Sequence, residues 1–159
     1  MEWMGREVNS ARDLLETALE AKLEFKRLER RVESLSARSL QFSLSSESEH
    51  VREIHHLLGL EVVRELSNMQ RCSDHLDAAD ELIEQIPDAA YRNLLRYRYF
   101  DDATHTQMQM RLLSDLHLHY SERTITRMLK AAKDEAQKVW ENLHDPEGQK
   151  TDGKEEMYD

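Results

Sequence analysis

The sequence predicts an all-α protein in which a long N-terminal helical hairpin, able to form a coiled coil, precedes a C-terminal helix-turn-helix module. The composition favours helices, because the 159 residues include only four Gly and two Pro and 34% of them are charged. Apolar residues recur at three- and four-residue spacings over most of the chain. We expect a coiled-coil oligomerisation hairpin over residues 1–86, the helix-turn-helix module over residues 87–144, and a disordered acidic tail over residues 145–159.

A first long helix is expected from about Glu7 to Leu35. Its apolar residues alternate spacings of three and four without a break, which is the heptad pattern of a coiled coil. The seam consists of Ala11, Leu14, Ala18, Ala21, Phe25, Leu28, Val32 and Leu35. Residues 36–48 break the pattern because six of the thirteen are Ser, and we expect a polar loop there rather than a short extended piece.

A second long helix is expected from about Glu49 to Ile86. Its inward residues follow four-residue spacings at first and then return to the three-four alternation. They are Val51, Ile54, Leu58, Val62, Leu66, Met69, Cys72, Leu76, Ala79, Ile83 and Ile86. Gly59 is unfavourable inside a helix and is interpreted as the mark of a close crossing. Two helices with a short connection lie antiparallel, and this hairpin is too thin to bury both apolar stripes, so we expect a homodimer or a higher oligomer.

Pro87 ends the second helix, because proline lacks an amide donor, and Asp88 can start the next one. The apolar contacts of that next helix are Tyr91, Leu94, Leu95 and Tyr97. It stops at Asp101 and Asp102, and residues 104–107 then have the form of a capping box that opens a further helix. The inward residues of this further helix are Met108, Leu112, Leu113 and Leu116. Residues 117–120 form the following turn.

The last helix, from Ser121 to about Leu143, has the features of the recognition helix of a helix-turn-helix. Ser121 is a good N-cap, and one face of the helix is apolar. That face consists of Ile125, Met128, Leu129, Ala132 and Ala136. The remaining surface carries Glu122, Arg123, Thr126, Arg127, Lys130 and Lys133. Such a helix can enter a DNA major groove, although an amphipathic helix whose exposed face simply carries charge fits the pattern equally well.

The net charge of −10 argues at first sight against nucleic acid, but the charges are unevenly distributed. Residues 1–46 are neutral, residues 47–88 carry a net charge of −8, and residues 141–159 carry −5. Residues 89–140, which contain the candidate recognition helix, carry +3. Because salt limits the reach of the acidic sections to about 8 Å, this local basic surface can still attract phosphate groups.

Two stretches, Leu94-Leu-Arg-Tyr-Arg-Tyr99 and Tyr120-Ser-Glu-Arg-Thr124, carry a family resemblance that extends over residues 83–135. This part of the chain resembles the C-terminal half of the phage-encoded ArpU/RinA-type late transcription regulators, whose fold is similar to region four of bacterial sigma factors. The resemblance implies that double-stranded DNA is the partner. The residues it implies in DNA contact are Ser121, Glu122, Arg123, Thr126 and Arg127, with Thr104, His105 and Thr106 near the phosphates. Where the family usually has a glycine in the turn, this chain has His119, and histidine can adopt the left-handed conformation that such a turn needs.

Catalytic and metal chemistry find little support in the sequence. Eight His and one Cys raise the question of zinc, but a structural zinc site needs four ligands and each close pair supplies only two. The close pairs are Cys72 with His75, His55 with His56, and His117 with His119. No Gly-rich phosphate loop and no nucleophile motif is present. We therefore expect no cofactor, no metal and no enzymatic activity.

No apolar run approaches the roughly 20 residues that span a membrane, and no cationic and apolar leader opens the sequence. The lone Cys72 suits a reducing compartment. We expect a cytoplasmic protein, associated with the nucleoid of a bacterial host. Two alternatives to a transcription regulator stay open: a phage DNA-packaging protein, and an interaction module that binds host RNA polymerase.

Overall fold

The computed structural model describes residues 1–45 and 49–144, and nearly all of the regular structure in these ranges is helical. The chain divides into two compact units. The hairpin unit contains residues 20–76, and the helix-turn-helix unit contains residues 1–19 together with the described residues from 77 onward. Two long helices, α1 (Ala11–Ser45) and α2 (Glu49–Glu84), run through both units. The predicted all-α class and the long N-terminal helix pair are thus confirmed.

The chain begins with a small antiparallel pair of strands, β1 (Glu2–Trp3) and β2 (Arg6–Glu7), in which Trp3 lies opposite Arg6. Met4 and Gly5 form the turn with φ values of 48° and 80°, the left-handed conformation that tight hairpin turns require. The predicted helix start at Glu7 is therefore wrong. Helix α1 begins four residues later, because the Ser10 hydroxyl accepts a hydrogen bond from the Asp13 amide at 3.1 Å and caps the first turn.

The loop expected over residues 36–48 is also wrong as far as residue 45, because α1 continues as a helix to Ser45. The extended alternative for this stretch is excluded for the same reason. The stretch contains neither Gly nor Pro, and serine is only a few tenths of a kcal/mol poorer in a helix than the best helix formers. Nothing in its sequence therefore stops the helix. The rest of the predicted connection, residues 46–48, lies outside the described residues.

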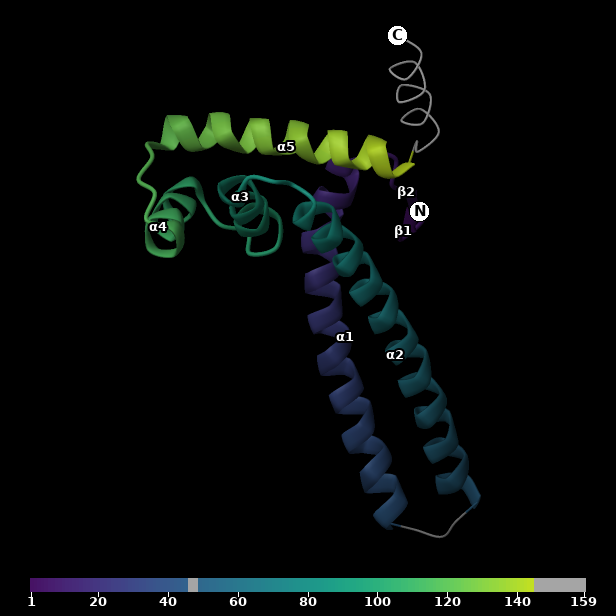
Figure 1. The fold of residues 1–159 in the computed structure, drawn as a ribbon. Coiled ribbons are helices and arrows are strands. Elements are labelled where there is room, and N and C mark those ends of the chain that lie inside the picture. The colour runs from purple at the N-terminus through teal and green to yellow at the C-terminus, as the bar shows by residue number, and fades with distance from the viewer. Residues whose placement is uncertain (46–48, 145–159) are drawn as a thin grey trace, which may run out of the picture. The chain divides into compact units, whose positions relative to one another are not determined.

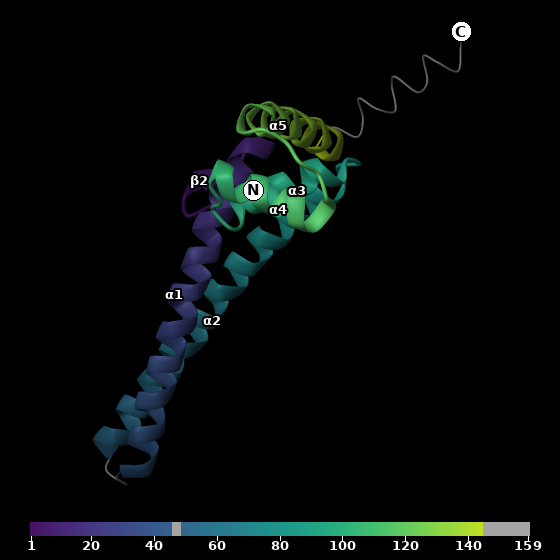
Figure 2. The ribbon, with the colours of Figure 1, turned by 90° about the vertical axis from the view of Figure 1, so that its left-hand side faces the viewer.

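In the hairpin unit, α1 and α2 run side by side in opposite directions (Figures 1 and 2). The predicted seam of α1 does face inward, with Ala21, Leu28 and Leu35 buried in this unit. On α2 the inward line differs from the prediction, since Leu66 is 48% exposed and its neighbour Glu65 is only 5% exposed. Positions 58, 65 and 72 keep a seven-residue repeat, so α2 stays in a regular heptad by turning a carboxylate inward where the prediction placed Leu66.

The buried Glu65 carboxylate has cationic partners on both helices. Arg31 of α1 approaches it at 3.7 Å, and Arg64 of α2 approaches it at 3.8 Å. Arg31 also lies 4.0 Å from Glu61. These ion pairs join the two helices and compensate for removing the Glu65 charge from water.

The helix-turn-helix unit is built around three helices, α3 (Ala89–Tyr99), α4 (His105–Leu116) and α5 (Glu122–His144). Helix α5 lies across α3 and α4 (Figures 1 and 2). Their common core consists of Leu94, Leu95, Met108, Leu112, Ile125, Leu129 and Ala132. One predicted core residue is wrong, because Leu113 is 47% exposed. Each turn of α4 places one residue in the core, and in the turn that contains Leu113 this residue is Leu112.

The start of the chain belongs to this same unit. The Ala11 amide donates to the Gln137 side chain of α5 at 3.0 Å, and Trp3, Val8 and Trp140 are all buried in the unit. The units therefore divide within α1 and α2, instead of at the predicted boundary of residue 86. A coiled-coil oligomerisation hairpin over residues 1–86 stays a prediction, and the predicted acidic tail over residues 145–159 lies outside the described residues.

Candidate nucleic-acid interface

The N-terminus of α4 is closed by the predicted capping box. The Thr104 hydroxyl accepts a hydrogen bond from the Gln107 amide at 3.2 Å, and the Gln107 side chain accepts one from the Thr104 amide at 2.9 Å. Both bonds satisfy amides that a helix leaves without partners. The prediction is confirmed, and it fixes the position at which residues 104–106 enter α4.

The turn between α4 and α5 depends on a left-handed residue, but this residue is His117 rather than the expected His119. His117 has a φ of 56°, and its amide donates to the Leu113 carbonyl at 3.1 Å. The next amide, of Leu118, donates back to the Leu112 carbonyl at 3.3 Å. The first of these bonds is the one that a left-handed residue makes when it ends a helix. The backbone therefore turns directly after α4, two residues earlier than expected.

The far end of the turn is held by two side chains. Gln109 of α4 donates to the Tyr120 carbonyl at 2.7 Å. Ser121 then caps α5, because its hydroxyl accepts a hydrogen bond from the Thr124 amide at 3.2 Å. The predicted N-cap is confirmed, and buried Ile125 anchors the first turn of α5 in the core.

A hydrogen bond also joins the beginnings of α4 and α5. The Thr106 hydroxyl donates to the Glu122 carboxylate at 2.9 Å, across 16 residues of sequence. Thr126, one turn further along α5, donates its hydroxyl to the Glu122 carbonyl at 3.0 Å. The structure thus brings together three of the predicted site residues. Their polar groups are occupied with one another, which suits a role in orienting the two helices.

All ten predicted site residues lie on the surface of the helix-turn-helix unit. They are Thr104, His105, Thr106, Ser121, Glu122, Arg123, Thr126, Arg127, Lys130 and Lys133. One of them leans toward the body of the unit, since the Lys133 ammonium lies 5.9 Å from the centroid of the Tyr99 ring, within cation–π range.

The arginines of α3 and α4 are held by partners inside the unit. Arg96 forms ion pairs with Asp80 and Glu84, and Arg92 donates to the backbone carbonyls of residues 86 and 87. Arg98 pairs with Asp102 at 3.2 Å, and Arg111 pairs with Asp101 at 2.7 Å. Each of these four side chains thus has a carboxylate or backbone carbonyl partner within the unit.

The basic side chains on the first turns of α5, in contrast, lack such partners among the described residues. Arg123, Arg127 and Lys130 are exposed, and none of them has a carboxylate partner among residues 1–45 and 49–144. Their spacings of four and three residues place them on one side of the helix. We call these three residues the cationic stripe. The exposed Asp134, one turn beyond Lys130, ends it.

The sequence did not reveal several contacts that join α3, α4 and the turn before α5. Gln109 fixes the turn, and the Tyr97 hydroxyl donates to the Asp115 carboxylate. Burial, reinforced by that hydrogen bond, raises the pKa of Tyr97 to about 12, so its hydroxyl keeps its proton at neutral pH. Arg111 lies over the same ring, 5.4 Å from its centroid. These contacts join residues 11 to 18 positions apart, and no local sequence pattern signals them.

Other kinds of site find no support in the described part of the chain. No group of three or more His, Cys, Asp or Glu side chains among these residues is arranged to hold a metal ion. None of the described helices is long and apolar enough to cross a membrane.

Comparison of the chain with known protein families, curated protein sequences and solved structures gives no match. The resemblance to phage late regulators therefore stays a prediction.

Proposed function

We propose that this protein binds double-stranded DNA sequence-specifically through the N-terminal half of α5 and acts as a phage or prophage transcriptional regulator. The observation that carries the proposal is the cationic stripe: among residues 1–45 and 49–144, Arg123, Arg127 and Lys130 have no carboxylate partner, whereas the arginines of α3 and α4 are held by partners. A unit that pairs the arginines of α3 and α4 but leaves one face of α5 cationic is suited to an anionic partner. It does so without enzymatic activity or cofactor, in the cytoplasm of a bacterial host.

The geometry also suggests which residues contact bases and which contact phosphates. The stripe spans eight residues, or about 10 Å of helix, which matches the part of a recognition helix that fits a major groove. Arg123 and Arg127 lie one turn apart and can reach base edges together. At the start of α4, after the capping box of Thr104 and Gln107, the amides of His105 and Thr106 are not used by the box and are suited to a phosphate.

The test is a selection from random duplexes, followed by titration of the enriched sequence at several salt concentrations. Arg123→Ala should weaken binding by ~1–3 kcal/mol and relax the preference at one base pair. Lys133→Ala should weaken binding to all sequences alike. It should also lower by about one the number of counterions released on binding, which the salt dependence measures. Arg98→Ala is the matched control, because Arg98 is equally cationic but paired with Asp102, and it should change the affinity little.

A second candidate is a module that binds protein, such as host RNA polymerase. It is favoured by two apolar side chains one turn apart on α4, Met110 at 66% and Leu113 at 47% exposure. If no duplex is enriched, and if Arg123→Ala and Arg127→Ala bind DNA as the wild type does, the DNA proposal fails. Loss of polymerase binding on changing Met110 and Leu113 to Ser would then support the second candidate.

A further inference from the structure

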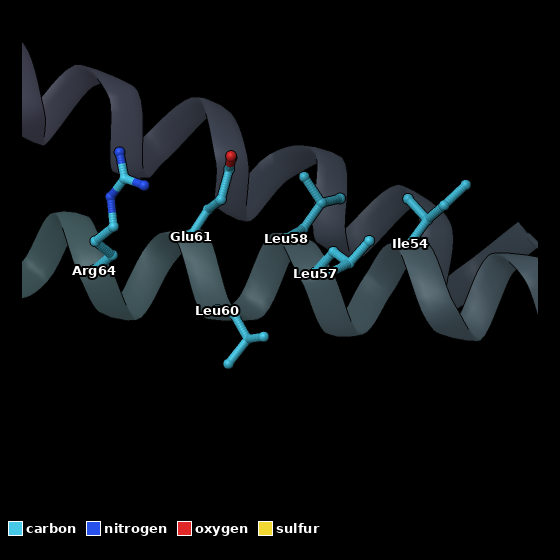
Figure 3. Close-up of a pocket in the computed structure, with 6 residues that line it drawn as sticks. All are labelled: Ile54, Leu57, Leu58, Leu60, Glu61 and Arg64. Atoms are coloured by element: carbon cyan, nitrogen blue, oxygen red, sulfur yellow. The ribbon is translucent and has the colours of Figure 1, made fainter.

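Most of the apolar seam of α1 is already buried within the chain. Ala21, Leu28 and Leu35 are buried inside the hairpin unit, so they cannot also pack against another molecule. Helix α2, in contrast, carries apolar side chains on its exposed side, including Leu60 at 54% and Val63 at 65% exposure. Figure 3 shows Leu60 directed away from the other helix of the hairpin. In the hairpin unit, the longest series of exposed apolar side chains therefore lies on α2, at Leu57, Leu60, Val63 and Leu66.

Gly59 on this side of the helix has no explanation within the chain. After proline, glycine is the least favourable residue inside a helix. A Cβ built on Gly59 would meet nothing within 4 Å, so no neighbour in the described structure requires its small size. A glycine that the chain itself does not require, beside exposed Leu60 and Val63, is explained if a helix from outside approaches closely there.

The outer positions of α2 have a spacing that fits a second copy of the same helix. They are Arg52, His56, Gly59, Val63, Leu66 and Gln70. The successive spacings are four, three, four, three and four residues, and this order reads the same in both directions. Two copies can therefore interdigitate in an antiparallel arrangement in which Gly59 of each copy receives Val63 of the other.

The charged residues near the two ends of this outer side favour the antiparallel orientation over the parallel one. Exposed Arg52, near the N-terminal end of the outer side, has no carboxylate partner among the described residues. At the other end, exposed Asp74 accepts a hydrogen bond from Gln70 at 2.8 Å. Antiparallel packing brings Arg52 of each copy to the Gln70–Asp74 pair of the other, whereas parallel packing would place like charges together.

We propose that the chain forms an antiparallel homodimer through the outer side of α2, centred between Gly59 and Val63. This inference does not depend on DNA binding, because none of its residues belongs to the helix-turn-helix unit.

The test is sedimentation of the full chain over a range of concentrations, with Gly59→Gln as the main variant. Glutamine is a good helix former, so the change should raise the thermal midpoint of the dilute monomer. At the same time its side chain should block the close approach and weaken dimerisation roughly tenfold or more. If Gly59 affected only the stability of its own helix, Gly59→Gln would raise the thermal midpoint without weakening dimerisation.

Two further sets of variants sharpen the result. Val63→Gln should abolish the dimer, whereas Leu23→Gln, which removes an equally exposed leucine from α1, should leave it unchanged. Arg52→Asp and Asp74→Arg should each weaken the dimer, and the double variant should recover it, which a parallel pairing does not predict. A wild-type chain that stays monomeric at all concentrations, or a Gly59→Gln chain that associates normally, overturns the proposal.

Discussion

The two compact units bury different chemistry, although both are built from amphipathic helices. The helix-turn-helix unit closes around large apolar side chains, among them Leu94, Leu95, Met108 and Ile125, all fully buried. The hairpin unit instead buries Glu65, Cys72 and His75 along α2, while Leu57, Leu60, Val63 and Leu66 of the same helix are exposed. The arrangement of apolar and polar residues is thus partly inverted in α2.

This difference indicates what each unit is built to contact. A three-helix core filled with large side chains is stable by itself, and it leaves its exposed face free to be polar and cationic. A two-helix hairpin with buried polar groups gains less from its own packing and has apolar surface left for another helix. This difference supports the two proposals made above, an anionic partner for the first unit and a second copy of the chain for the second.

The largest expected effect tests whether the helix-turn-helix unit depends on its core. Ile125→Ala removes a fully buried side chain shared by α3, α4 and α5, and should destabilise the unit by ~2–5 kcal/mol. Met110→Ala, an exposed change in the same unit, should stay within about 0.5 kcal/mol. Amide hydrogen exchange would measure both changes, with faster exchange across α3–α5 in the first variant. Equal effects of the two variants would contradict the description of the core.

A smaller effect, of opposite sign, is expected in the hairpin unit. Glu65 is buried and paired with Arg31 and Arg64 at 3.7 and 3.8 Å. Glu65→Leu should raise the free energy of unfolding by ~1 kcal/mol, because apolar packing replaces a desolvated carboxylate and both arginines remain partly in water. The control is Glu61→Leu, at an exposed carboxylate near the same Arg31, which should have little effect. Urea unfolding at low protein concentration measures both, and a loss of stability in Glu65→Leu would show that the ion pairs matter more than the burial.

The features that the sequence predicted well are local ones. Thr104 with Gln107, and Ser121 with Thr124, lie three residues apart, so a cap can be recognised without knowing the fold. The same holds for the apolar face of α5, whose period is set by the helix alone. These local signals were enough to place the three C-terminal helices and the exposed face of α5.

The features that the sequence did not predict depend on contacts between distant residues. Hydropathy favoured Leu66 as the inward residue of α2, but the heptad register selected Glu65, whose partner Arg31 lies on the other helix. The pairing of Arg96 with Asp80 and Glu84 likewise crosses from α3 to α2. Without these pairs, all arginines of the basic section look equivalent, and the cationic stripe of α5 cannot be distinguished from the rest.

The smallest expected effect concerns pH and the hairpin unit. Of the eight histidines in the described part of the chain, His75 alone is buried. Burial lowers the pKa of His75 from its usual 6.5, and the nearby Glu20 carboxylate only partly offsets this. Between the lowered value and 6.5 the unfolded chain binds a proton that the folded chain does not. The stability that neutral His75 provides is therefore complete above pH 6.5 and is lost as the pH falls toward the folded-state pKa.

The measurement is the urea midpoint of the hairpin unit between pH 7.5 and 5.5. The wild type should lose stability over this range, and His75→Gln should lose less, because it removes the titrating ring. His55→Gln, at an exposed position of the same helix, should keep the wild-type slope. Comparing slopes rather than absolute midpoints removes the cost of the substitution itself. If all three proteins showed the same slope, the polar residues buried in the hairpin unit would not make its stability more sensitive to acid than that of the helix-turn-helix unit.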